Sequence, residues 1–136
     1  MIDFKVRRIS EGDYEVILSK WWKSWRWTPP AKDSLPENGL GGVIVSLDGV
    51  DICAGFLFLT NSKTAWCEYI ISNFEYKDKN RHDAIEFLIR VLTSMAKERD
   101  YKYIYTSLKS KSLMDKYEAC GYIKGSESCT EMLKII

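Results

Sequence analysis

The chain has 136 residues, of which 46% are hydrophobic and 29% are charged, a balance typical of a folded domain and not of a disordered chain. Its 20 basic and 19 acidic residues leave a net charge of +1, so overall charge gives no reason to expect a nucleic acid or an anionic membrane as partner. This length predicts a single domain over residues 1–136, with a core that needs no disulfide or metal.

Cysteine and histidine usage predicts a reduced protein without a metal site. The cysteines are Cys53, Cys67, Cys120 and Cys129, no two of them spaced as CxxC, and His82 is the only histidine. We therefore expect no zinc site and interpret the cysteines as free thiols. The charged N-terminus lacks the pattern of a signal peptide, and no apolar run approaches the roughly 20 residues of a membrane helix. These features favour a cytoplasmic location.

The N-terminal third predicts a strand, a helix and a long loop. Alternation over 4–7 indicates a short strand, and Ser10 with Asp13 three residues later is typical of a helix start. Apolar side chains then recur at helical spacing and define one buried stripe: Tyr14, Ile17, Leu18, Trp21 and Trp25. The helix must end before two prolines, and residues 29–42, rich in proline and glycine, are predicted to form a loop whose length is typical of functional or disordered segments.

The middle of the chain predicts an antiparallel meander. Its three strands are expected at 43–47, 52–60 and 65–71. An Asp-Gly pair between the first two is a strong hairpin signal, and a short polar turn joins the second to the third. The middle strand is nearly all apolar, which indicates burial on both faces.

The C-terminal half predicts two helices and two strands. Apolar residues along one face indicate a long helix at 81–99, followed by a strand at 103–105, a short helix at 113–119 and a final strand at 132–136. Strands on either side of the long helix imply a crossover and one parallel pair, whereas the other pairs are antiparallel. The sequence therefore predicts an α/β fold with a mixed, mostly antiparallel sheet flanked by helices.

The order of elements and two local patterns resemble the GNAT superfamily of N-acetyltransferases over essentially the whole chain. Many of these enzymes carry the run N-x-x-A-x-x-L-Y-x-x-x-G-F, and residues 110–122 align with it without gaps. Tyr117 and the Gly-aromatic pair that ends the run match, whereas Ser110 replaces the Asn and Leu113 replaces the Ala. The resemblance implies a GNAT-like fold, transfer of an acetyl group from acetyl-CoA to an amine, and a place for Ser110 at the cofactor site.

The second pattern precedes the long helix, where the family carries a phosphate-binding R/Q-x-x-G-x-G/A turn. By position this turn falls on Lys79, Asn80, Arg81, His82, Asp83 and Ala84. Lys79 stands for the Arg/Gln and His82 for the first Gly, or, in a second register, Arg81 is the basic residue. A helix N-terminus offers amides and partial positive charge to a pyrophosphate, whereas Asp83 opposes an anion. The alternative interpretation is an ordinary charged helix start.

By the same resemblance, the cofactor lies where the fourth and fifth strands diverge. The backbone of Ile70, Ile71 and Ser72 would pair with the pantetheine arm as with an added strand, although the two isoleucines are also natural core residues. Tyr117 is implied as the acid that protonates the leaving thiolate, the alternative being a tyrosine that packs at a helix end. Glu68 is the candidate base, because a mid-strand acid lies either in solvent or in a cleft that raises its pKa.

The segment from Trp21 to Trp27 leaves three interpretations open. Trp21 and Trp25 continue the core stripe, whereas Trp22 and Trp27 do not. By resemblance, Trp22, Trp27 and the loop residue Glu37, a weaker candidate base, would line the site of the acceptor amine. An aromatic and basic run also stacks on nucleic-acid bases, which the near-zero net charge opposes. We expect a small-molecule or peptide amine as acceptor, no membrane partner, and a monomer or homodimer.

A competing interpretation is a degenerate GNAT-fold protein that acts as a non-enzymatic CoA-binding or protein-interaction module. The departures at His82 and Ser110 favour it, whereas Tyr117 and the basic helix start oppose it. A narrower likeness, to GNAT proteins found in bacteriophage genomes, rests on Trp21-Trp22, Leu35-Pro36-x-x-Gly39 and Ser72-Asn73.

Overall fold

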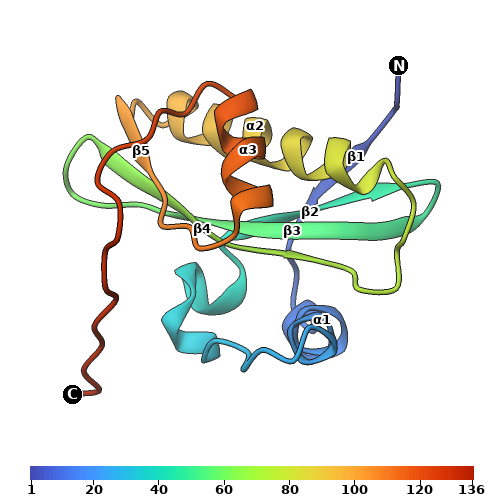
Figure 1. The fold of residues 1–136 in the computed structure, drawn as a ribbon. Coiled ribbons are helices and arrows are strands. Elements are labelled where there is room, and N and C mark those ends of the chain that lie inside the picture. Colours follow the sequence, from blue (N-terminus) through green and yellow to red (C-terminus); the bar gives the residue numbers. More distant parts are fainter.

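Five strands form one sheet in the order β1-β2-β3-β4-β5 (Figure 1). The computed structural model describes all 136 residues. The strands are β1 (Lys5–Arg8), β2 (Gly42–Leu47), β3 (Val50–Phe58), β4 (Thr64–Ser72) and β5 (Tyr103–Tyr105). The first four pair antiparallel, and β5 pairs parallel with β4. The predicted mixed, mostly antiparallel sheet is therefore confirmed.

Helices cover both faces of this sheet (Figure 1). The helical elements are η1 (Tyr14–Leu18), α1 (Ser19–Ser24), η2 (Lys32–Ser34), η3 (Pro36–Gly39), α2 (Arg81–Glu98) and α3 (Lys111–Ala119). One core cluster joins the sheet to α2 and α3, and a second joins the opposite face to η1 and α1. None of the helices is long and apolar enough to cross a lipid bilayer.

The α2 helix crosses from β4 to β5 and packs closely on the sheet. Its buried positions recur at helical spacing: Ala84, Ile85, Leu88, Ile89, Leu92 and Ala96. On β3, a Cβ at Gly55 would lie 2.6 Å from Ile70 Cδ1 and 3.0 Å from Leu92 Cδ1. A glycine at this position therefore permits the close approach of helix and strand.

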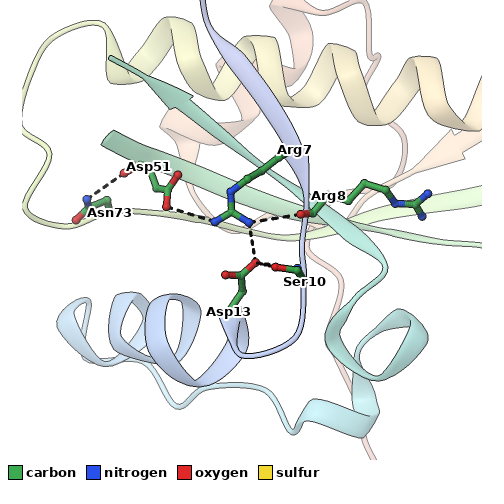
Figure 2. A network of polar contacts seen from close by, with 6 residues as sticks. All are labelled: Arg7, Arg8, Ser10, Asp13, Asp51 and Asn73. Atoms are coloured by element: carbon green, nitrogen blue, oxygen red, sulfur yellow. Dashed lines mark hydrogen bonds and ion pairs between the residues drawn. The ribbon is translucent and has the colours of Figure 1, made fainter. Parts of the chain in front are cut away.

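A polar network ties the start of the η1–α1 segment to the sheet (Figure 2). Arg7 on β1 donates to Asp13 Oδ2 at 2.8 Å, and the same oxygen accepts from the Ser10 amide at 2.8 Å. Arg7 also reaches Asp51 on β3 at 3.5 Å. Burial opposes ionisation of Asp13, but the hydrogen bonds from Arg7 and Ser10 together hold its pKa below the usual value. This network fixes where the helix begins.

The prediction that Trp22 stands outside the core stripe is wrong. Its side chain is only 4% exposed, and its ring stacks at a centroid distance of 6.5 Å on Phe56. The physical reason is η1, whose five residues from Tyr14 form a π-helical turn. A π turn adds a residue to the helical period and shifts the phase of the α1 turns after it, so Trp21 and Trp22 are both buried.

The prediction of a final strand at 132–136 is also wrong. No helix or strand follows α3, and the C-terminus lies away from the sheet (Figure 1). The apolar side chains of this tail are 89% exposed or more: Met132, Leu133, Ile135 and Ile136. A strand needs a paired edge and a buried face, and the tail runs past β5 without either.

Candidate active site

Strand β4 carries a β-bulge in its middle. Ala54 pairs with Ile71 and Phe56 pairs with Glu68, so two β4 residues between these pairs oppose one β3 residue. The first of the two, Tyr69, has a φ of 58°, in the left-handed region that residues other than glycine rarely adopt. Nothing in the sequence near Tyr69 signals this conformation. The bulge interrupts the regular pairing, which resumes at Ile71.

Beyond a short paired stretch, β4 has an open edge. It pairs with β5 only where Thr64–Trp66 face Tyr103–Tyr105. From Cys67 onward, β3 is the only strand beside β4, so main-chain groups on the other edge have no strand partner. Such an edge can pair with an extended ligand.

The three residues expected to pair with pantetheine lie along this open stretch of β4. Ile71 is 1% exposed and belongs to the core cluster under α1, and Ile70 is half-buried and packs against the other cluster. The carbonyl of Ser72 accepts a hydrogen bond from Trp25 Nε1 at 2.8 Å. The side chains are therefore structural, and the end of the strand is already anchored to the segment after α1.

Glu68 bridges the gap where β4 and β5 diverge. Its Oε1 accepts from the Ser107 amide at 2.6 Å and from Thr106 Oγ1 at 3.0 Å, both just past the end of β5. Partial burial raises the pKa of Glu68 above its usual value; the two hydrogen bonds act against this, and the charge of Glu131 adds to it. Glu68 is thus a positioned carboxylate with increased proton affinity.

Tyr117 lies in the core beside the neighbouring β4 residue. It is 2% exposed, and its hydroxyl shares a hydrogen bond of 3.0 Å with Cys67 Sγ. Its ring meets that of Tyr122 edge-on at 4.8 Å. Burial raises the pKa of Tyr117 far above its usual value and raises that of the Cys67 thiol to about 12. Both groups are therefore protonated at neutral pH.

The candidate acid and base lie on opposite faces of β4. Consecutive strand residues point to opposite sides of a sheet. Cys67 and Tyr117 belong to the core cluster under α2, whereas Phe56, the cross-strand partner of Glu68, belongs to the cluster under α1. The open β4 edge is where the two faces meet.

At the predicted phosphate turn, most main-chain amides already donate hydrogen bonds to carbonyls of preceding residues. The amides of Arg81, His82 and Ala84 donate to the carbonyls of Asp78, Lys79 and Asn80, at 3.1, 3.4 and 2.9 Å respectively. The Asp83 amide has no acceptor.

Among the side chains of this turn, Lys79, His82 and Asp83 are exposed and Ala84 is buried. Arg81 donates to the Tyr76 carbonyl at 3.2 Å and lies over the Trp25 ring at 5.6 Å.

Two other cofactor candidates hold local structure. Asn80 Oδ1 accepts from the Tyr76 hydroxyl at 2.6 Å, and Ser110 Oγ caps α3 by accepting from the Leu113 amide at 3.3 Å. Both contacts lie at the start of a helix.

The predicted acceptor residues lie in different surroundings. Trp27 is 55% exposed and stacks on Trp25 at 5.7 Å. Glu37, in η3, lines a hollow of about 270 Å³ beside Arg8 and Arg99. Trp22 is in the core. The structure therefore does not bring these three together.

Solved acetyltransferases share this architecture. An acetyltransferase from Trypanosoma brucei has a TM-score of 0.68 and 15% identity, with 96% of this chain and 100% of that one covered. Glucosamine-6-phosphate N-acetyltransferase from Arabidopsis thaliana has a TM-score of 0.65 and 13% identity, covering 97% and 99%. AAC(6')-Iy, solved with the bisubstrate analogue CoA-S-monomethyl-acetylneamine, has a TM-score of 0.66 and 10% identity, covering 98% and 99%.

The chain has the GNAT fold. The likeness spans nearly the full length of both chains in each case, and the expected sheet with its flanking helices is the shared part. No family model matches the chain, and no curated protein does. At these identities the likeness establishes the fold, and activity has to be argued from the residues of this chain.

Proposed function

We propose that this protein is an N-acetyltransferase that uses acetyl-CoA to acetylate an amine, with Glu68 as general base and Tyr117 as general acid. The observation that carries the proposal is the open edge of β4, flanked by Glu68 on one face and by Tyr117 beside Cys67 on the other. The acetyltransferases that share the fold support it.

The residues present fit acetyl-CoA. The unpaired β4 edge offers main-chain groups to an extended amide-containing arm, as a strand edge does to a peptide. At the start of α2, Lys79 and His82 are exposed, and the Asp83 amide is without an acceptor. These groups and the helix N-terminus would hold the pyrophosphate, with Arg81 nearby. The Asp83 carboxylate weakens this site without closing it.

Glu68 would prepare the acceptor. Acetyl-CoA supplies an activated acyl group as a thioester, and the attacking amine must first lose a proton. Two hydrogen bonds fix Oε1 of Glu68, and partial burial increases its proton affinity, so the carboxylate suits proton transfer directly or through water. Positioning by Thr106 and Ser107 limits the reorganisation that proton transfer requires.

Tyr117 would assist the departure of the thiolate. Its hydroxyl is protonated, buried, and held on the far face of β4 by Cys67. From there it can donate a proton to a sulfur that leaves through the open edge. Acid and base then act from opposite faces, so neither neutralises the other.

We infer that the acceptor is a small-molecule or peptide amine and that the protein works in the cytoplasm as a monomer or homodimer. We also propose that the chain is related to the GNAT proteins found in bacteriophage genomes. The acceptor approaches the site from the face of the sheet that carries Glu68.

The deciding experiment combines binding with turnover. Acetyl-CoA at about 100 times its dissociation constant should stabilise the fold by roughly 2.7 kcal/mol, seen as a rise in melting temperature. A screen of amines should then release free CoA. Lys79→Glu with Arg81→Glu should reduce the thermal shift, whereas Lys63→Glu, a surface change near the β3–β4 turn, should not. Stabilisation without turnover across the screen would favour the non-enzymatic CoA-binding module, and no stabilisation would exclude both CoA functions.

A further inference from the structure

Four aromatic rings flank Glu68 on the α1 side of the sheet, and the proposed chemistry does not use them. Phe58 pairs across the strands with Trp66, which lies two residues before Glu68 on β4 and therefore on the same face. The Trp66 ring lies 5.3 Å from that of Tyr105, and the Phe58 ring lies 6.0 Å from that of Tyr69. We call these four residues the aromatic rim.

The aromatic rim is open to solvent on its outer side. Tyr69 is 40% exposed and Tyr105 is 57% exposed, and neither belongs to a core cluster. Tyr69 reaches Phe58 from the bulge, where its positive φ strains the backbone. Backbone strain of this kind is found preferentially at functional sites. The strained backbone here brings an exposed ring to the carboxylate.

The charge at the rim is negative. Two donors occupy Oε1 of Glu68, while Oε2 has no partner within the protein. Glu131 lies close enough to act on Glu68 electrostatically. Lys109 pairs with Glu131 at 3.3 Å, but both side chains are largely exposed, so this pair offsets little of the charge. Ring faces and a free carboxylate oxygen together attract a cation.

We propose that the aromatic rim selects the acceptor: a cationic primary amine on a flat, apolar body, of the arylalkylamine class. The ammonium group lies at Glu68 and the apolar body stacks on Tyr69 and Tyr105. This inference rests on the proposed function, because it names the acceptor of the same site. An acceptor covered with hydroxyl groups would find ring faces where it needs hydrogen-bond partners.

Calorimetric titration with 2-phenylethylamine tests the rim without acetyl-CoA. Tyr69→Ala with Tyr105→Ala should weaken binding about 10-fold, a typical value for partly exposed cation–π contacts. Tyr69→Phe keeps the ring and should keep the affinity, which separates ring loss from misfolding. Tyr103→Ala is the matched control, since Tyr103 is a 60% exposed tyrosine on β5 that lies two residue pairs further from Glu68 than Tyr105 does. Neutral 2-phenylethanol should bind about 10-fold more weakly than the amine.

Equal binding of 2-phenylethylamine and glucosamine would overturn the inference, as would an equal loss in Tyr103→Ala. The same amines with acetyl-CoA separate this inference from the proposed function. A higher kcat/KM for glucosamine would keep the acetyltransferase and reject the rim as selector. Binding of 2-phenylethylamine that depends on Tyr69 and Tyr105, in a protein that neither binds acetyl-CoA nor releases CoA, would keep the amine site and reject the acetyltransferase.

Discussion

Two adjacent residues of β4 divide the candidate chemistry between the faces of the sheet. Cys67 holds the hydroxyl of Tyr117 in the core, and Glu68 holds the segment after β5 through its two hydrogen bonds. The alternation of a strand gives this separation without any loop. Tyr117 and Glu68 can therefore each be tested by a substitution that removes one functional group and keeps the shape of the side chain.

Tyr117→Phe removes the proposed acid and keeps the ring. Turnover should fall roughly 10²–10⁴-fold, with the loss in kcat more than in KM. Folding should change little, because a single hydrogen bond contributes only about 1 kcal/mol. Tyr122→Phe is the matched control: it loses the 2.7 Å hydrogen bond to Thr93 and should retain turnover. Full activity of Tyr117→Phe in the CoA-release assay would remove this hydroxyl from the mechanism.

Glu68→Gln should change how stability depends on pH. Because the pKa of Glu68 is raised in the folded state, its favourable contribution is complete below the unfolded pKa, near 4.3, and is lost as pH rises through the folded pKa. Glutamine stays neutral and keeps an acceptor oxygen for Ser107. The melting temperature of Glu68→Gln relative to the wild type should therefore rise from pH 4 to pH 7. A difference that stays constant or falls over this range would contradict the raised pKa.

At the scale of elements, the helical segment before η2 shows what periodicity can predict and where it fails. The stripe of Leu18, Trp21 and Trp25 was predictable, since a regular helix repeats every 3.6 residues. The π-helical η1 was not, because Tyr14–Leu18 is also compatible with a regular α-helical turn, and η1 brings Trp22 into the core. The bulge at Tyr69 escaped prediction for the same reason: its only sequence correlate is Gly55, on another strand.

The stability losses of Trp22→Ala and Trp27→Ala should distinguish a core tryptophan from a surface tryptophan. Trp22 packs on Phe56 and is 4% exposed, so its loss should cost roughly 3–5 kcal/mol of unfolding free energy. Trp27 is 55% exposed, so its loss should lower the unfolding free energy by less than about 1 kcal/mol. Urea denaturation of the two variants measures both values. Similar losses would mean that Trp27 is also part of the core.

At the scale of the whole molecule, the sheet, its parallel β4–β5 pair and its two helical layers followed from patterns of hydrophobicity. The sequence also pointed to Glu68 and Tyr117, but not to their place on opposite faces of β4, which depends on the face of the sheet that α3 covers. The C-terminal tail was mispredicted because apolar, β-branched residues indicate strand preference without naming a partner. In the structure that partner is lacking.

Removal of residues 130–136 should leave the fold intact. Their apolar side chains are 89% exposed or more, so their loss uncovers no core and should change the unfolding free energy by less than about 0.5 kcal/mol. Leu92→Ala, a fully buried change in α2, is the positive control and should cost about 2–5 kcal/mol. Chemical denaturation compares them. A loss of several kcal/mol on truncation would show that the tail docks as a strand.

The most direct test of the central claim is amide hydrogen exchange with and without CoA. The open edge of β4 and the start of α2 should be the binding surface, so amides within 67–72 and 79–84 should exchange more slowly when CoA is present. Amides in β1, at the opposite edge of the sheet, should be unchanged. Protection confined to other segments, or none at saturating CoA, would contradict the assignment of this edge to the cofactor.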